Sequence, residues 1–285
     1  MTQNGKFIVF DGTDGSGKKT QMDLLVDQLR KEGYKIETAD FPQYGNWSAE
    51  FVARYLRGEF GTLDQISAKK ASLFYALDRF AASFQIREWL SKGIHVISNR
   101  YTSANKGHQL GKIQDPKERV EFLNWVNDLE YGILGIPKPD ITIFLHMDSA
   151  IGQRLVDKKA DREYTRGVKR DIHEADINHL KNAESAYLFC LKNDKSENWK
   201  RIVCFENDQP KPIEEIQKEV YKVVKEIVNY YKRNKFDDIV IVAPLSVIKK
   251  MCELGIKPLW AEMHKGRFIK FKRITDIKIE YEEGK

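Results

Sequence analysis

Cysteine is scarce in this 285-residue chain, which contains only three. Cys190, Cys204 and Cys252 are odd in number and widely spaced, so they form neither a disulfide framework nor a zinc-binding pattern. We expect buried thiols at these positions.

Long apolar runs and blocks of like charge are also missing. No stretch of about 18 apolar residues predicts a transmembrane helix, and residues 1–6 lack the regions of a signal peptide. The net charge of +6, from 48 basic and 42 acidic residues, is compatible with an acidic ligand such as a nucleotide. The charges are dispersed, and no block of like charges indicates a tail that binds nucleic acid. With 41% hydrophobic and 32% charged residues, the composition predicts a soluble globular protein. Without a predicted signal peptide or transmembrane helix, we expect the cytoplasm as its compartment, and we expect neither nucleic acid nor membrane as a partner.

Short apolar runs alternate with helical patterns along most of the chain. Such alternation predicts an α/β fold, a parallel five-stranded sheet flanked by helices, with ligands at the carboxyl ends of the strands. The predicted strands are Phe7–Phe10, Lys35–Phe41, Ile94–Ser98, Asp140–Leu145 and Arg201–Phe205.

A different pattern begins near the C-terminus. A helix with one apolar face is predicted from Ile213 to Tyr231. Beyond Asn234 the pattern predicts a short strand at 239–242, a helix at 246–254 and a β-ribbon from Arg267 to Tyr281. We therefore expect a core domain of residues 1–234 and a small C-terminal α+β appendage of residues 235–285, whose role the sequence does not disclose.

A glycine-rich loop follows the first predicted strand. Its sequence, Gly-Thr-Asp-Gly-Ser-Gly-Lys from Gly12 to Lys18, fits the G-x-x-x-x-G-K part of a phosphate-binding loop between a strand and a helix. Backbone N–H groups of such a loop surround phosphate oxygens, and the lysine reaches the β- and γ-phosphates. The predicted ATP-binding residues are Gly12, Thr13, Asp14, Gly15, Ser16, Gly17, Lys18, Lys19 and Thr20.

One loop position departs from the pattern, because Lys19 stands where a Ser or Thr hydroxyl usually binds Mg²⁺. Two interpretations remain open. Either Mg²⁺ is held by waters and other residues, with Thr20 and Asn99 as candidate ligands, or the metal site is degraded.

Five segments resemble the thymidylate kinase family of P-loop nucleoside monophosphate kinases, from about Lys6 to about Tyr231. They are residues 7–21, the Asp-Phe-Pro-Gln segment at 40–43, the Leu-Phe-Tyr-Ala-Leu-Asp-Arg segment at 73–79, the Asn-Arg-Tyr segment at 99–101 and the Pro-Lys-Pro-Asp segment at 137–140. The resemblance implies transfer of the γ-phosphoryl group of ATP to dTMP, with Mg²⁺, in a homodimer.

The resemblance also implies an acceptor site. Asp14 is placed near the sugar, Tyr75 against the thymine ring, and Arg100 at the phosphate. The full set of implied substrate-binding residues is Asp14, Phe41, Tyr75, Arg79, Arg100, Asn105 and Gln109. The chain departs from the family pattern where Asp40 replaces a basic residue, Asn99 replaces an aspartate and His108 replaces a tyrosine.

A basic segment from Asp161 to Arg170 occupies the position of the family's lid. Family members with glycine at the position of Gly15 supply the catalytic arginine from this lid, and a guanidinium there stabilises the transferring phosphoryl group. The catalytic candidates are Lys18, Arg162, Arg166 and Arg170.

Two other functions remain open at this stage. One is a kinase for another nucleotide or deoxynucleoside, with the same core and a different pocket. The other is a catalytically weak nucleotide-binding protein whose C-terminal segment mediates an interaction, a possibility raised by Lys19 and Asn99.

Overall fold

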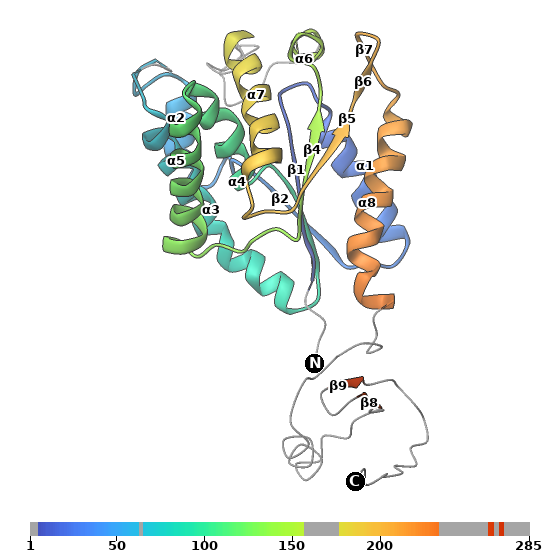
Figure 1. Ribbon diagram of the computed structural model, residues 1–285. Helices are drawn as coiled ribbons and strands as arrows, with labels where there is room; N and C mark the ends of the chain where they lie inside the picture. Colours follow the sequence, from blue (N-terminus) through green and yellow to red (C-terminus); the bar gives the residue numbers. More distant parts are fainter. Residues whose placement is uncertain (1–4, 63–64, 157–176, 234–261, 265–267, 271–285) are drawn as a thin grey trace. The chain divides into compact units, whose positions relative to one another are not determined.

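The computed structural model describes residues 5–62, 65–156, 177–233, 262–264 and 268–270 (Figure 1). By its internal contacts the chain divides into two compact units, Met1–Ile227 and Val228–Lys285.

The first unit is built on a parallel five-stranded sheet with the strand order β2-β3-β1-β4-β5 (Figure 1). Its strands are β1 (Phe7–Asp11), β2 (Ile36–Asp40), β3 (His95–Asn99), β4 (Ile141–His146) and β5 (Trp199–Val203). The predicted fold class is therefore confirmed. Every residue of β1 and β4 is buried, which explains why central strands flanked on both faces are continuous apolar runs in the sequence.

The fifth strand lies two residues earlier than the sequence pattern predicted. Thr142 of β4 pairs with Trp199, and His146 pairs with Val203. Phe205, predicted to end this strand, instead begins the short hairpin of β6 (Phe205–Glu206) and β7 (Gln209–Pro210). Only Ile202 of β5 is buried, so this edge strand carries a weak periodic signal.

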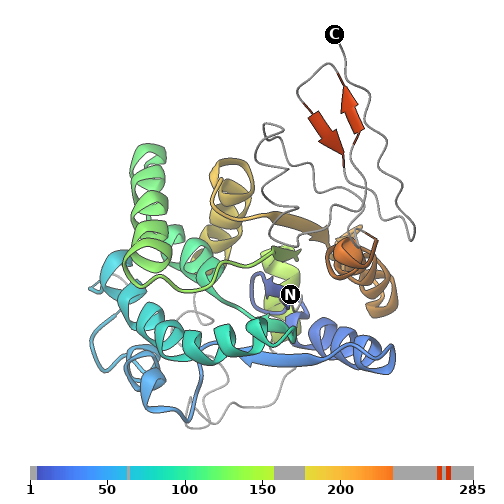
Figure 2. The same cartoon turned by 90° about the horizontal axis from the view of Figure 1, so that it is seen from below.

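Helices cover both faces of the sheet. Seen from below, α1 and α8 lie on one side, and α3, α5 and α7 lie on the other (Figure 2). The α-helices are α1 (Lys18–Lys31), α2 (Glu50–Leu56), α3 (Ala68–Ser91), α4 (Thr102–Ala104), α5 (Pro116–Asn127), α6 (Ser149–Val156), α7 (Ile177–Asn193) and α8 (Ile213–Arg233). Two π-helical segments, η2 (Asn105–Gln109) and η4 (Asp128–Ile133), and two 3₁₀ turns, η1 (Trp47–Ala49) and η3 (Leu110–Lys112), complete the described helical structure.

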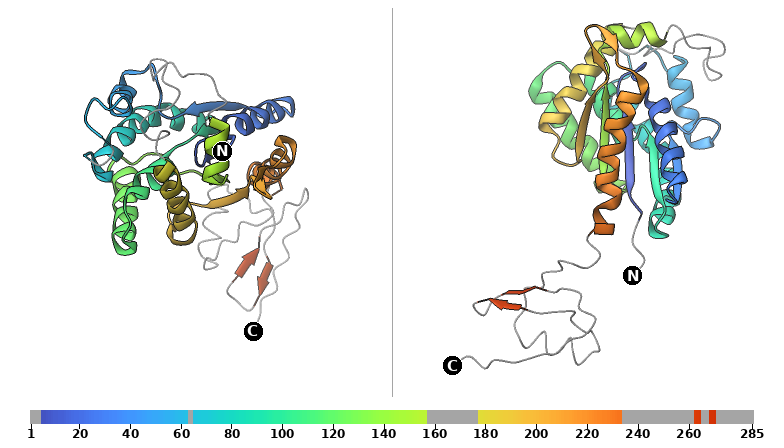
Figure 3. Two further views of the ribbon diagram at one scale, coloured as in Figure 1. Left: turned by 90° about the horizontal axis from the view of Figure 1, so that it is seen from above. Right: turned by 90° about the vertical axis from the view of Figure 1, so that its right-hand side faces the viewer.

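The predicted helix near the C-terminus is confirmed as α8. Its apolar face buries Ile216, Val220 and Val224. It runs beside α1, where the side-chain amide of Gln21 donates to the carbonyl of Ile213 at 3.0 Å. Figure 3 shows the two helices side by side.

In the second unit the structure describes one β-ribbon. Strands β8 (Glu262–His264) and β9 (Phe268–Lys270) pair antiparallel. The ribbon predicted from Arg267 to Tyr281 thus begins earlier than expected, and the rest of that range lies outside the described residues. The short strand predicted at 239–242 and the helix predicted at 246–254 also lie outside them.

Two further expectations concern the described residues. Cys190 and Cys204 are buried free thiols, as predicted, and burial raises their pKa. Among the helices that the structure describes, none has the length and apolar character needed to cross a bilayer.

Candidate active site

The glycine-rich loop lies between the carboxyl end of β1 and the start of α1. Gly15 adopts a φ of 81°, and a Cβ atom there would meet the backbone oxygen of Gly152 at 2.2 Å. A larger residue at this position, including an arginine, would need the backbone of α6 to move. The Lys18 ammonium lies over the loop, donating to the carbonyls of Gly12 at 3.0 Å and Thr13 at 2.9 Å.

Asp11, which the sequence analysis did not select, holds the base of this loop. The carboxylate is fully buried and accepts hydrogen bonds from the Gly12 N–H at 2.8 Å, the Ser103 hydroxyl at 2.5 Å and the Tyr187 hydroxyl at 2.7 Å. Burial raises the pKa of Asp11 above its ordinary value, although Arg100 acts against the increase. An aspartate directly at the end of a buried strand is the signal that could have identified this residue.

A cleft of about 570 Å³ extends from the loop along the ends of β2 and β3. Its lining combines the loop and the start of α1 with the last residues of these two strands and the residues that follow them: Asp14, Gly15, Gly17, Lys18, Lys19, Thr38, Ala39, Asp40, Phe41, Pro42, Gln43, Tyr44, Asn99 and Arg100. The cleft is thus open to a ligand whose phosphates contact the loop.

A second, smaller cavity adjoins the cleft and contains every residue that the sequence analysis placed at the acceptor. Its lining is Asp14, Phe41, Pro42, Leu56, Tyr75, Arg79, Arg100, Ala104, Asn105, His108 and Gln109. Four residues, Asp14, Phe41, Pro42 and Arg100, line both spaces. The two spaces therefore share a wall, as two substrates exchanging a group require.

Arg100 occupies an uncommon backbone conformation at this shared wall. Its φ is 64°, a left-handed value that few non-glycine residues adopt and that is often found at functional sites. The guanidinium forms a close ion pair with Asp14, and the backbone N–H donates to the Phe10 carbonyl at 2.7 Å. The tight strand-to-helix turn thus directs a cation toward the loop.

Arg79 lines the acceptor cavity and is held by a partner that the sequence did not reveal. Its Nε donates to Glu130 at 2.6 Å and its Nη2 donates to the same carboxylate at 2.7 Å. A third hydrogen bond, at 3.1 Å, reaches the backbone carbonyl of Tyr101. The exposed fractions are 1% for the arginine side chain and 0% for the glutamate side chain. A lone glutamate in a helical segment gives no sequence signal for such a pair.

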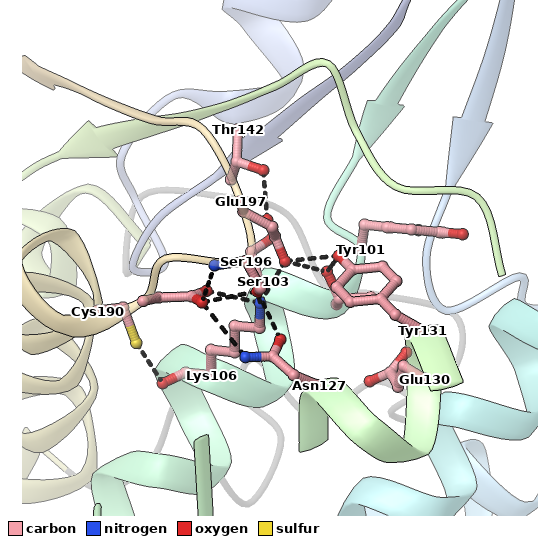
Figure 4. Close-up of polar contacts among 12 residues, drawn as sticks. Tyr101, Ser103, Lys106, Asn127, Glu130, Tyr131, Thr142, Cys190, Ser196 and Glu197 are labelled. Carbon is pink, nitrogen blue, oxygen red and sulfur yellow. Dashed lines mark hydrogen bonds and ion pairs between the residues drawn. The ribbon is translucent and has the colours of Figure 1, made fainter. Parts of the chain in front are cut away.

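Next to this pair, a buried ion cluster fixes the segment that carries Asn105 and Gln109. Lys106 of η2 donates to Asp194 at 2.7 Å and forms a close ion pair with Glu197. Figure 4 shows Glu197 also accepting hydrogen bonds from Tyr131 at 2.6 Å and Thr142 at 2.6 Å. The cluster joins η2, η4, β4 and the turn before β5 into one support beneath the acceptor cavity.

His108 stands where the family pattern has a tyrosine, and its ring is buried in the cavity wall. It stacks with His179, and the two rings approach to 3.4 Å between ring nitrogens. Burial lowers the pKa of His108 well below its ordinary value, and the nearby Arg100 lowers it further. The imidazole is therefore neutral at neutral pH.

The two residues named as metal ligands differ in their positions. Asn99, at the end of β3, lines the cleft, and its Nδ2 donates to Asp40 at 2.8 Å. Thr20 is exposed in the first turn of α1 and is not part of the cleft lining. Among the described residues no group of three or more His, Cys, Asp or Glu side chains has the arrangement of a metal cage. Thr20 as a ligand stays a prediction.

The predicted lid and its arginines, Arg162, Arg166 and Arg170, lie outside the described residues. Their catalytic role stays a prediction.

Comparisons with known proteins agree with this geometry. The model of the thymidylate kinase family matches residues 10–220. The thymidylate kinase of Mycobacterium tuberculosis is 32% identical over 171 residues, which is 59% of this chain and 78% of the relative. The thymidylate kinase of Danio rerio is 23% identical, over 80% of this chain and 93% of the relative.

A solved structure supports the fold. Thymidylate kinase from Candida albicans superposes with a TM-score of 0.62 and 22% identity, covering 79% of this chain and 93% of that one. The match of the family model over most of the chain decides the assignment, and the chain belongs to the thymidylate kinase family, the enzymes that phosphorylate dTMP with ATP to give dTDP.

Proposed function

We propose that this chain catalyses phosphoryl transfer from ATP to dTMP, with the ATP phosphates on the loop at Gly12–Lys18 and dTMP in the cavity lined by Tyr75 and Arg79. The observation that carries the proposal is the wall shared by Asp14, Phe41, Pro42 and Arg100, which joins the loop cleft to that cavity. Phosphoryl transfer depends mainly on positioning and on electrostatic stabilisation, so two adjacent phosphate sites are its first requirement.

The residues of the cavity divide between the parts of dTMP. Tyr75, half-buried on α3, offers a ring on which thymine stacks, and the buried Phe41 closes the wall beside the shared edge. Arg100 binds the monophosphate, since a guanidinium matches phosphate oxygens with two parallel hydrogen bonds. Asp14 accepts from the 3′-hydroxyl. Because these two side chains pair with each other, dTMP binding redistributes an existing ion pair.

Asp40 and Asn99 fit the role of holding Mg²⁺. They lie at the ends of neighbouring strands, in the same cleft as Lys18, and the Oδ1 of Asn99 is buried without accepting a hydrogen bond from the described residues. Mg²⁺ prefers oxygen ligands and usually binds one or two protein groups together with phosphates and waters. When bound it neutralises charge on the transferring phosphates. Asp40 thus supplies the carboxylate that Asn99 lacks.

Lys18 binds the β- and γ-phosphates of ATP, and the lid arginines provide the further positive charge of the transition state. Gly15 supports this division, because its close approach to Gly152 leaves no room for an arginine in the loop itself. A planar guanidinium bridges two phosphoryl oxygens, as the ammonium of Lys19 does not.

The apolar outer face of α3 supports a homodimer. Leu73, Leu77 and Phe84 have exposed fractions of 41%, 51% and 60%, and their spacing of four and seven residues places them on one helical face. An exposed patch of this kind is typical of a protein interface. A dimer of the cytoplasm, with nucleotides as its small-molecule partners, accounts for this surface and for the dispersed charge. The appendage of residues 235–285 is assigned no part in the chemistry.

Coupled assays of dTMP, dUMP, dCMP, dGMP and thymidine with ATP and Mg²⁺ test the proposed function. We expect dTMP to have the highest kcat/KM. A higher value for another acceptor would assign the same core to a different kinase, and binding of ATP without turnover of any acceptor would leave a nucleotide-binding protein.

A further inference from the structure

Glu130 lies outside the two lined spaces but contacts two residues that line the acceptor cavity. Besides its two hydrogen bonds from Arg79, it accepts one from the Nδ2 of Asn105 at 2.9 Å. All three side chains are buried. Glu130 is therefore placed to determine which hydrogen-bonding groups its two neighbours present to a ligand.

The contacts of Asn105 fix the orientation of its amide. Its Nδ2 donates to Glu130 and also to the backbone carbonyl of Ser72 at 3.2 Å. An amide NH₂ has two donors, and both are used by these acceptors. The group that remains for a ligand is the carbonyl oxygen Oδ1, which only accepts.

Arg79, in contrast to Asn105, offers the cavity only hydrogen-bond donors. A guanidinium has five N–H donors and no acceptor. Glu130 and Tyr101 take three of these donors, so any group that Arg79 offers to the cavity donates. The wall beside Tyr75 thus presents one acceptor and one donor with a fixed polarity.

Local backbone geometry brings these groups together. Asn105 begins the π-helical segment η2, and Glu130 lies in the π-helical segment η4. π-helical turns are rare and are frequently found at functional sites. Here the two segments η2 and η4 meet at the buried carboxylate of Glu130. This geometry is a second observation, independent of the cavity lining, that indicates a functional role for Glu130.

We propose that Glu130 is a positioning residue that sets the hydrogen-bond polarity of the acceptor cavity and so excludes cytosine. This inference rests on the proposed function. Thymine and uracil carry an N3–H donor beside the O4 acceptor, which complement the Asn105 oxygen and an Arg79 N–H. Cytosine carries an acceptor at N3 and the N4 amino donor, so both of its groups meet a group of the same kind.

The polarity argument makes a selective prediction. dUMP has the same pyrimidine edge as dTMP, and dGMP has the same order of donor and acceptor on its N1 and O6. Polarity therefore does not separate dTMP from either of them, and only the ratio of dTMP to dCMP depends on Glu130.

The test is the set of kcat/KM ratios in Glu130→Gln. Its amide places a donor against Arg79 or Asn105, so the Asn105 amide is no longer held in one orientation. We expect the preference for dTMP over dCMP to fall about tenfold or more, because a mismatched buried donor or acceptor accounts for discrimination of that size. The ratios of dTMP to dUMP and to dGMP are expected to stay unchanged.

Glu184→Gln is the matched control, since the half-buried Glu184 carboxylate hydrogen-bonds His146 at 2.8 Å and the Ser149 N–H at 3.0 Å, and neither of these residues lines the acceptor cavity. It should lower stability while leaving all three ratios unchanged. If Glu130→Gln does not fold, Asn105→Ala provides the second test and should show the same selective loss against dCMP.

The outcomes separate the two proposals. A wild-type enzyme that uses dTMP and dCMP equally would overturn the proposed function itself. A wild-type enzyme that prefers dTMP, with Glu130→Gln and Asn105→Ala keeping that preference, would overturn only the role of Glu130, as would equal losses in all three ratios.

Discussion

Replacing Lys106 by methionine tests whether the buried ion cluster supports the acceptor site. Lys106 lies between Asp194 and Glu197, and the side chains of all three residues are fully buried. Although burial alone would lower the pKa of Lys106, the two carboxylates raise it overall. Methionine fills a similar volume but leaves two carboxylates without their cation. We expect a loss of about 3–5 kcal/mol in the free energy of unfolding, the usual cost of breaking a buried pair by removing one partner.

The pH dependence of this loss gives a second readout. Burial by itself raises the pKa of Asp194 and of Glu197, but Lys106 reverses this, so both folded-state values lie below the ordinary 3.8 and 4.5. In the wild type the carboxylates therefore stabilise the fold above those unfolded values, and this contribution is lost as the pH falls through the folded values. Without Lys106 their folded pKa values rise, and protonation relieves the unpaired charge. The difference between Lys106→Met and the wild type should thus shrink from pH 7 to pH 5.

Urea unfolding followed by circular dichroism measures both effects. Lys92→Met is the matched control, because Lys92 pairs with Glu88 on the exposed surface of α3, where such pairs contribute little. The KM for dTMP should rise in Lys106→Met more than the KM for ATP, since η2 carries Asn105. A loss below about 1 kcal/mol at pH 7, or one that grows on acidification, would contradict the reasoning.

Three further predictions concern the lid, the appendage and His108. The lid arginines are Arg162, Arg166 and Arg170, and replacing the catalytic one by alanine should lower kcat by about 10³ or more while leaving the affinity for dTMP nearly unchanged. A kcat near the wild-type value in every single variant and in the triple variant would exclude a catalytic role for all three. Truncation before Phe236 should leave phosphoryl transfer intact, and a truncated protein that folds and binds both nucleotides without transfer would reassign the appendage to the active site. The folded pKa of His108 is depressed, so below the ordinary pKa of 6.5 the unfolded chain binds a proton that the folded chain does not. The free energy of unfolding should therefore decrease as the pH is lowered below 6.5, by up to about 1.4 kcal/mol per pH unit. A glutamine at position 108 should flatten that slope in urea unfolding, whereas an unchanged slope would show that His108 does not cause it.

Local patterns were sufficient to predict the sheet and the loop. Each of these patterns involves residues that are close together in the sequence, and each constrains the backbone directly. They are the apolar run at Phe7–Phe10, the glycines that follow it and the helical spacing after Thr20. The proposed acceptor residues were selected by resemblance to a family, because side chains from separate segments line one cavity only after folding. Tyr75 beside leucines would otherwise be assigned to the core.

The supporting charges could not be predicted because their partners are distant in sequence. Arg79 and Glu130 are 51 residues apart, and Lys106 and Glu197 are 91 apart. Each charged residue alone indicates a solvated surface, since such side chains are almost never fully buried without a partner. No local pattern shows that the partner exists.

The π-helical segments explain why helical spacing also failed to reveal these residues. In an α-helix, residues 105 and 109 share a face because four residues make slightly more than one turn. In η2 the turn is wider, yet Asn105 and Gln109 both line the cavity, while Lys106 between them reaches the buried carboxylates on another side. The Oε1 of Gln109 is buried there without a hydrogen bond from the described residues. The wider turn thus places two amide side chains in the wall of the cavity and fixes their segment through a buried cation, and neither arrangement is visible in a pattern of apolar residues.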